Sequence, residues 1–160
     1  MVDERGRVVG ISLRAPSGAK YAVQGGHHGL FVPTGVVAGR RLLVCEGQSD
    51  AAACIDLGFQ AIGRAGARST LKIACAVVHE LRPSEVVVVG DRDEAGTRGA
   101  DEISSALAVG RAVRVILPPE GIKDVREWKR RGATAADVEA AIAAAPRIIL
   151  GVCVRTGGRQ

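Results

Sequence analysis

The sequence is poor in aromatic residues: they make up 2% of its 160 residues, with one Trp, one Tyr and two Phe. Proteins that recognise nucleic acid by stacking bases on aromatic side chains need several such platforms. A nucleic-acid reader of that kind is therefore excluded. The apolar fraction of 47% is nevertheless sufficient for a folded core, and the length fits one compact domain with room for a small appendage.

The four cysteines, at positions 45, 54, 75 and 153, form no C-x-x-C pair, so this chain alone cannot build a zinc ribbon. Three of them lie within apolar runs, where cysteine is typical of a small core residue. The N-terminus carries no hydrophobic signal core, and no apolar run approaches the roughly 18 residues of a membrane span. These absences predict a cytoplasmic protein that has no membrane partner.

Two nucleotide-binding motifs are also missing. Neither the phosphate-binding loop G-x-x-x-x-G-K-[ST] nor the dinucleotide fingerprint G-x-G-x-x-G occurs, so a nucleotide-driven motor and a dinucleotide-dependent enzyme lack support. The overall charge is basic, with 22 Lys and Arg against 17 Asp and Glu and a formal net charge of +5. Such a charge favours polyanionic partners through Coulomb attraction and the release of counterions.

The N-terminal part of the sequence differs in pattern from the rest. Residues 7–33 contain short apolar segments separated by Pro and Gly, which predicts short strands joined by turns. We expect a small β-rich N-terminal subdomain with a hairpin over residues 1–38. The main domain is expected over residues 39–150, and a polar C-terminal tail over residues 151–160.

Within the main domain, continuous apolar runs alternate with segments of helical periodicity. Continuous runs are typical of strands that are buried on both faces of a parallel sheet, and the alternation predicts an α/β fold. We expect a mostly parallel sheet of about four strands flanked by helices, and residues 147–154 are a candidate for a last strand. The expected strands lie within residues 41–46, 59–63, 84–90 and 111–119, and the expected helices within residues 49–58, 69–83, 94–110, 124–132 and 134–145.

Acidic residues follow these predicted strands. Glu46 follows the first strand, Asp91 and Asp93 follow the third, and Asp124 follows the fourth after a loop. Ligands gather at the carboxyl ends of strands in such sheets. Carboxylates that converge there repel one another unless a cation lies between them. Mg²⁺ or Mn²⁺ is the expected cation, because both prefer oxygen ligands, and a pair of such ions supports phosphoryl transfer.

Plainer interpretations of the same residues remain open. A single D-x-D pair is common in solvated or helix-capping loops, and Asp50, near the start of a predicted helix, could serve only the helix dipole. Arg64 and Arg68 flank Gly66 in a predicted loop near the acidic edge, where they could bind nucleotide or phosphate or remain solvated. Lys123 could neutralise a triphosphate or lie on the surface.

The order and spacing of the acidic residues resemble the Toprim family, which is found in primases, topoisomerases, recombination proteins and some nucleases. The resemblance covers roughly residues 41–118, about half of the chain. It implies a Toprim-like, Rossmann-like fold. It also implies catalytic roles for Glu46, Asp91 and Asp93, and a set of ligands for Mg²⁺ or Mn²⁺. The matching features are Glu46-Gly47 with Asp50, Gly66, Asp91-x-Asp93 and Ala95-Gly96; the implied metal ligands are Glu46, Asp50, Asp91, Asp93 and Asp124.

Within that family the chain is most similar to the catalytic cores of bacterial, phage and mobile-element DNA primases. Lys123-Asp124 matches a primase segment that follows the next strand, whereas Arg126 stands where those primases often have a further Asp. The resemblance implies metal-dependent nucleotidyl transfer that makes short primers from nucleoside triphosphates on a single-stranded DNA template. It also implies partners such as a replicative helicase or separate zinc and helicase domains. We expect either the catalytic domain of a longer protein or a reduced primase.

Four other functions remain to be weighed. A Toprim nuclease would use the same carboxylates for hydrolysis, and a non-catalytic Toprim module would only bind nucleic acid. A haloacid-dehalogenase-type phosphatase is disfavoured, because two strand–helix units precede Asp91 here and Glu46 would have no role. A topoisomerase is disfavoured because the single tyrosine, Tyr21, precedes the Toprim-like region.

Overall fold

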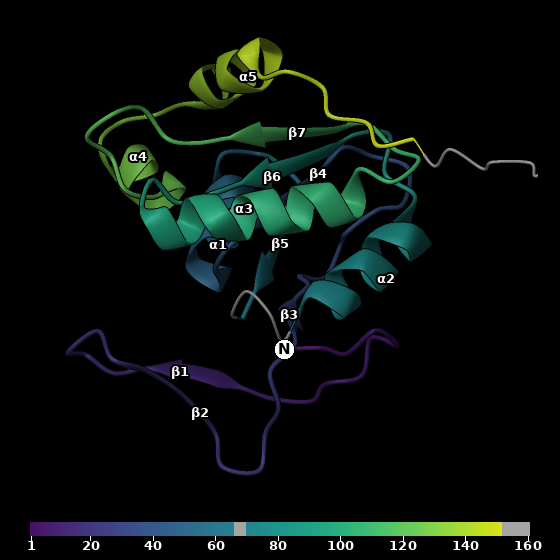
Figure 1. The fold of residues 1–160 in the computed structure, drawn as a ribbon. Coiled ribbons are helices and arrows are strands. Elements are labelled where there is room, and N and C mark those ends of the chain that lie inside the picture. The colour runs from purple at the N-terminus through teal and green to yellow at the C-terminus, as the bar shows by residue number, and fades with distance from the viewer. Residues whose placement is uncertain (66–69, 152–160) are drawn as a thin grey trace, which may run out of the picture.

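The computed structural model describes residues 1–65 and 70–151, which form one five-stranded sheet, a separate two-stranded hairpin and five helices. The expected α/β fold is confirmed (Figure 1). The strands are β1 (Ser12–Arg14), β2 (Lys20–Ala22), β3 (Leu30–Phe31), β4 (Leu42–Cys45), β5 (Ala61–Arg64), β6 (Val86–Val89) and β7 (Val113–Ile116). The helices are α1 (Gln48–Asp56), α2 (Leu71–Leu81), α3 (Glu94–Leu107), α4 (Val125–Arg130) and α5 (Ala135–Ala144).

The large sheet has the strand order β3-β5-β4-β6-β7. Strand β4 pairs in parallel with both β5 and β6, and β6 pairs in parallel with β7. These are the four strands that the sequence predicts. The fifth strand, β3, runs antiparallel to β5, with Leu30 opposite Arg64. The candidate last strand contributes only isolated bridges from Ile148 and Leu150 within the described residues.

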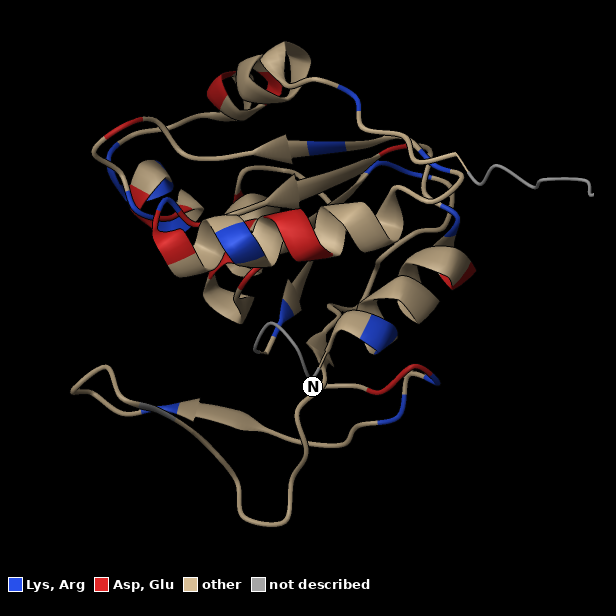
Figure 2. Ribbon diagram, in the orientation of Figure 1, with Lys and Arg blue, Asp and Glu red and all other residues tan. Residues whose placement is uncertain are grey.

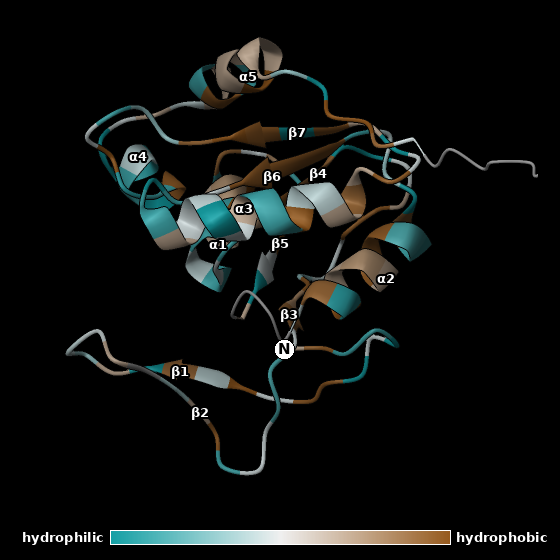
Figure 3. Ribbon diagram, viewed as in Figure 1, coloured by the Kyte–Doolittle hydropathy of each residue, from teal (hydrophilic) through white to brown (hydrophobic). Residues whose placement is uncertain are grey.

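Helices cover both faces of this sheet, because alternate residues of β4 and β6 point to opposite sides. On one face, Leu42 and Val44 pack with residues of α2 and α3. On the other face, Leu43 and Cys45 pack with residues of α1, α4 and α5. All four residues of β6 are buried, which explains why its sequence is a continuous apolar run. Strand β6 is accordingly hydrophobic, and the outward face of α3 is mostly hydrophilic (Figure 3).

Strands β1 and β2 form the predicted N-terminal hairpin, which lies apart from the layers of the main sheet in Figure 1. Leu13 pairs with Tyr21, and a turn that contains Gly18 at φ 90° joins the strands. Strand β3, which also precedes residue 38, belongs to the main sheet. Of the predicted polar tail at residues 151–160, only the first residue lies within the described part of the chain.

The cysteines of the described residues behave as core residues. Cys45 and Cys54 are buried, with their Sγ atoms 3.7 Å apart, and Cys75 is partly buried. Cys153 lies outside the described residues. No helix within residues 1–65 and 70–151 is long and apolar enough to cross a membrane.

Candidate active site

Two acidic residues lie side by side because the strands that precede them are parallel neighbours. Glu46 directly follows β4, and Asp91 follows β6 after Gly90. The register pairs Cys45 with Val89, the last residues of the two strands. The two chains therefore leave the sheet at the same edge, where the sequence predicts a ligand site.

Glycines let the start of α1 approach this edge closely. Asp50 lies in the first turn of α1 and is 6% exposed. A Cβ on Gly47, the N-cap residue of α1, would lie 2.7 Å from Oδ2 of Asp50. A Cβ on Gly63 of β5 would lie 2.6 Å from the carbonyl oxygen of Gly47. The close approach of β5, the loop and α1 thus depends on two positions without side chains, and it fixes Asp50 near Glu46.

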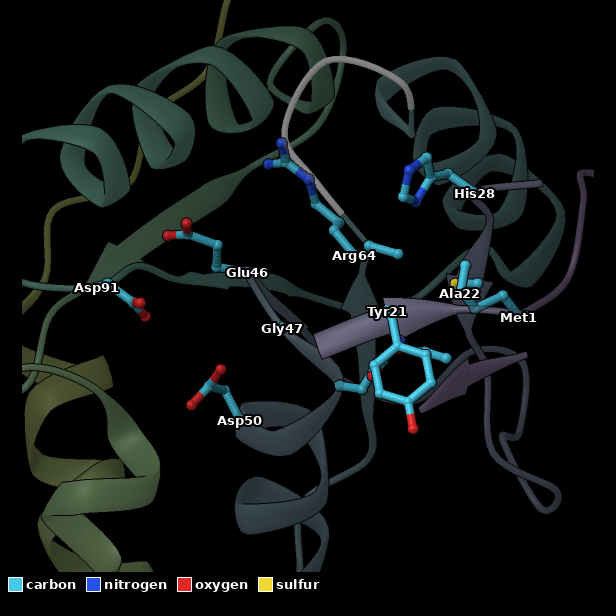
Figure 4. A pocket seen from close by; sticks show the side chains of 12 residues that line it. Met1, Tyr21, Ala22, His28, Glu46, Gly47, Asp50, Arg64 and Asp91 are labelled. Atoms are coloured by element: carbon cyan, nitrogen blue, oxygen red, sulfur yellow. The ribbon is translucent and has the colours of Figure 1, made fainter. Parts of the chain in front are cut away.

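Glu46, Asp50 and Asp91 line one pocket of about 340 Å³, and their carboxylates point into the same space (Figure 4). Arg64 also lines this pocket. The remaining wall comes from the N-terminal segment and hairpin, including Met1, Ser12, Tyr21, Ala22 and His28. Tyr21, Ser12 and His28 are residues that sequence reasoning did not place at the site. The spacing of residues along the chain gives no signal that the hairpin faces the acidic edge.

Crowding of negative charge changes the acidity of the site. Burial, followed by the charges of the four other acidic residues at this edge, raises the pKa of Asp91 to about 7. Burial and the neighbouring charge of Asp93 raise the pKa of Glu46, and this effect outweighs the opposing charge of Arg64. A bound cation would favour the ionised form of both carboxyl groups. The electrostatics therefore favour a cation in this pocket.

An oxygen of Glu46 is suited to such a cation. Glu46 Oε2 is buried and accepts no hydrogen bond from the residues that the structure describes. A buried oxygen without a donor costs stability, and Mg²⁺ and Mn²⁺ take oxygen ligands of this kind. The side chains present therefore fit a hard divalent cation. Across residues 1–65 and 70–151, no group of three or more His, Cys, Asp or Glu is arranged to hold a metal ion.

Asp93 is placed differently from Asp91. Its Oδ1 accepts a hydrogen bond of 2.8 Å from the N–H of Gly96 and caps α3. Its Oδ2 lies 3.0 Å from Nζ of Lys123. The hydrogen bond from Gly96 and the contact with Lys123 lower the pKa of Asp93. Asp93 thus has a structural role at the start of α3, and Lys123, for which the sequence leaves a triphosphate-binding and a surface role open, lies beside it.

Asp124 has the corresponding arrangement at α4. Its Oδ1 accepts a hydrogen bond of 2.6 Å from the N–H of Glu127 and caps that helix, and its Oδ2 lies 3.2 Å from Nη2 of Arg126. The structure therefore divides the five predicted metal ligands into two groups. Glu46, Asp50 and Asp91 share a pocket, whereas Asp93 and Asp124 each cap a helix and each contact a cationic side chain.

Of the two predicted phosphate-binding arginines, the structure describes one, Arg64. Arg64 is the last residue of β5 rather than part of a loop, and it is 3% exposed. Its Nη1 donates a hydrogen bond of 3.2 Å to the carbonyl oxygen of Gly99. Burial lowers the pKa of Arg64, while the charges of Glu102 and Glu46 oppose this effect. Arg64 is thus a buried cation beside the carboxylates, and Arg68 lies outside the described residues.

The strand-end carboxylates and the parallel sheet define a class of α/β protein with an acidic site at one sheet edge. A family model described as Toprim-like matches residues 43–128, more than half of the chain. The chain therefore belongs to the Toprim-like family. Among curated proteins, none matches this chain at a significant level.

Solved structures of primases share the fold. The DnaG primase catalytic domain bound to single-stranded DNA has a TM-score of 0.69 and 24% identity, and the match covers 92% of this chain and 51% of that one. A DNA primase domain from Pseudomonas aeruginosa has a TM-score of 0.67 and 20% identity, and the match covers 92% of this chain and 50% of that one. The Aquifex aeolicus primase, with zinc-binding and RNA polymerase domains, has a TM-score of 0.65 and 19% identity, and the match covers 92% of this chain and 39% of that one. This chain thus spans about half the length of these structures or less.

Proposed function

We propose that this chain is the catalytic Toprim domain of a DNA primase, which joins nucleotides from nucleoside triphosphates into short primers on single-stranded DNA and releases pyrophosphate. The observation that carries the proposal is that Glu46, Asp50 and Asp91 line one pocket, together with Arg64. The likeness to primase catalytic domains, one of them bound to single-stranded DNA, supports the choice of reaction and template.

The proposed cofactor is Mg²⁺ or Mn²⁺, held by Glu46 and Asp91 with Asp50 beside them. When bound, such an ion supplies Lewis-acid activation of a hydroxyl nucleophile and stabilises negative charge on the transferred phosphoryl group. Burial and the charge of Asp93 raise the pKa of Glu46 in the metal-free protein, and a bound ion would favour the ionised form that ligates it.

Two cationic side chains would bind the phosphates. Arg64 is buried at the pocket, where its guanidinium provides a fixed positive charge beside the carboxylates. Lys123 has a side chain that is 61% exposed, so it can move from Asp93 to an incoming triphosphate at a small cost. These cations would neutralise the triphosphate and orient it toward the attacking hydroxyl.

The test is incubation of the protein with single-stranded DNA, labelled nucleotides and Mg²⁺ or Mn²⁺, followed by separation of the products by size. We expect metal-dependent oligonucleotides from the unchanged protein and a loss of about 100-fold or more in Asp91→Asn. Asp101→Asn is the matched control, because Asp101 is an exposed residue of α3 and the chemical change is the same. Its yield should equal that of the unchanged protein.

The same reaction separates the alternative functions. A nuclease with these carboxylates would shorten the template instead of producing new oligonucleotides. A Toprim module that only binds nucleic acid would give neither product but would retain the labelled DNA in a filter-binding measurement. Either result would contradict the proposed function.

A further inference from the structure

The acidic edge is divided between two pockets of opposite character. The first contains Glu46, Asp50 and Asp91, as described above. The second has a volume of about 470 Å³ and lies at the start of α4, where acidic and basic residues are interspersed (Figure 2). It is lined by three cationic side chains and two carboxylates: Lys123, Arg126, Arg130, Asp124 and Glu127.

The carboxylates beside the second pocket already have partners within the protein. Both oxygens of Asp124 accept hydrogen bonds, one from the N–H of Glu127 and the other from Arg126. Both oxygens of Asp93 are also engaged, one by the N–H of Gly96 and the other by Lys123. A divalent ion at Oδ2 of either carboxylate would compete with a protein cation, and an ion bound to both oxygens would also release a helix cap.

The partner of Asp124 is held close by the chain itself. Arg126 lies two residues after Asp124, so the pair forms with little loss of chain entropy. The Asp124 side chain is 10% exposed, which limits the competition from water and salt for this ion pair. A divalent cation that approached would also meet the positive charge of Arg126 itself. The ion pair therefore disfavours a metal ion at Asp124.

We propose that Arg126 and Lys123 take the place of a second divalent cation, so that the acidic edge binds one divalent ion, in the pocket of Glu46, Asp50 and Asp91. This inference rests on the proposed function, because the ion in the first pocket is the one assigned there. The consequence is a site in which part of the positive charge around the substrate is built into the chain and does not depend on the concentration of metal.

The test is a count of bound Mn²⁺. The free ion is measured by electron paramagnetic resonance during titration of the full chain, without nucleotide or DNA. We expect one Mn²⁺ for the unchanged protein and two for Arg126→Asp, because this change removes the blocking cation and adds a carboxylate beside Asp124. Arg130→Asp is the matched control: it has the same change of charge on the same helix, and Arg130 contacts Glu127 rather than Asp124. It should bind one ion.

Each alternative outcome has a distinct meaning. Two ions on the unchanged protein would overturn this inference and leave the proposed function standing, whereas no bound ion would overturn both. One ion on Arg126→Asp, with an unfolding temperature equal to that of the unchanged protein, would also overturn the inference. The Arg126 side chain is 45% exposed, so the variant is expected to fold. The count on the unchanged protein does not depend on any variant.

Discussion

Burial and the neighbouring carboxylates destabilise the ionised form of Asp91. Its pKa of about 7 lies above the ordinary value of roughly 3.9, so the folded protein holds this proton at pH values where the unfolded chain has lost it. Stability from this group is therefore lost as the pH rises through 7. In metal-free protein, Asp91→Asn should raise the free energy of unfolding by on the order of 1–2 kcal/mol at pH 8, with the gain vanishing toward pH 4.

Urea unfolding at a series of pH values measures this effect, with Asp101→Asn as a control that should show no gain. Addition of Mg²⁺ should reverse the order at pH 8, because an ion that binds only the folded state stabilises the unchanged protein more than the variant. A variant that is less stable than the unchanged protein in metal-free buffer at pH 8 would show that Asp91 is a structural residue.

For single residues, the sequence predicts where the acidic side chains lie better than it predicts which groups they contact. Parallel strands bring their carboxyl ends together, so Glu46 and Asp91 could be placed from the pattern of apolar runs alone. The sequence does not reveal that Asp93 and Asp124 cap α3 and α4, because a capping carboxylate and a metal ligand occupy the same kind of position after a strand. The contact of Arg126 with Asp124 requires side-chain geometry that no spacing rule supplies.

Among the elements, α3, like α1, approaches the site closely at a glycine. A Cβ on Gly96 would lie 2.6 Å from both the Cβ and the carbonyl oxygen of Asp91. The backbone of Asp91 can move only at a substantial cost in free energy. Gly96→Ala should therefore push the start of α3 away from Asp91 and destabilise the protein by about 1–3 kcal/mol. This loss should exceed the helix-propensity gain of about 1 kcal/mol that alanine normally brings.

Thermal unfolding together with the Mn²⁺ affinity measures the effect of Gly96→Ala. The unfolding temperature and the Mn²⁺ affinity should fall together, because the new methyl group would contact Asp91 and Asp91 is a proposed ligand. Gly151→Ala is the control, because a Cβ there meets nothing within 4 Å. Unchanged stability and Mn²⁺ affinity in Gly96→Ala would mean that α3 and Asp91 can separate without consequence.

The helices and strands are largely predictable from the periodicity of apolar residues and from the Pro and Gly residues that end them. Helix α2 ends at Leu81, two residues before Pro83, and β6 is the expected run of valines. Strand β3 was not expected in the main sheet, because its two residues are too short to show a pattern and its partner β5 lies about thirty residues further along the chain. The order of the strands also depends on packing between distant segments, which local patterns do not report.

At the scale of the whole molecule, Glu85 joins segments at the sheet edge opposite the site. Its carboxylate accepts hydrogen bonds from Arg41, just before β4, and from Arg114 of β7, and Arg41 also contacts Glu139 of α5. Burial raises the pKa of Glu85, but the hydrogen bonds and charges of the two arginines outweigh it and lower the pKa overall. This ion-pair network therefore stabilises the ionised carboxylate and the packing of three strands.

Glu85→Gln should lower the free energy of unfolding by on the order of 1–2 kcal/mol at neutral pH. A lowered carboxyl pKa gives stability that is present above the ordinary value of about 4.3 and is lost as the pH falls through the folded-state value. The difference between the two proteins should therefore shrink in acid, as measured by urea unfolding against pH. Glu80→Gln, at an exposed position of α2, is the control, and a difference independent of pH would contradict the charge argument.

The hairpin and the main sheet should differ in local stability. Strands β1 and β2 have three residues each, and Ile11, Leu13, Tyr21 and Val23 are exposed apolar side chains of this hairpin, whereas β4 and β6 are buried throughout. Isolated two-stranded hairpins are marginally stable, so their backbone N–H groups exchange early. Hydrogen exchange followed by mass spectrometry should show fast exchange over residues 11–23 and slow exchange over β4 and β6.

Ligand binding should change this contrast selectively. The hairpin forms one wall of the pocket whose other wall carries the carboxylates, so a molecule that fills the pocket contacts both. Mn²⁺ with single-stranded DNA and a nucleoside triphosphate should therefore slow exchange over residues 11–23, while exchange in β6, already slow, stays the same. Mn²⁺ alone should have little effect on the hairpin, because its proposed ligands lie on the sheet side. If the full mixture leaves the hairpin unprotected, the substrate does not occupy the space between the hairpin and the acidic edge.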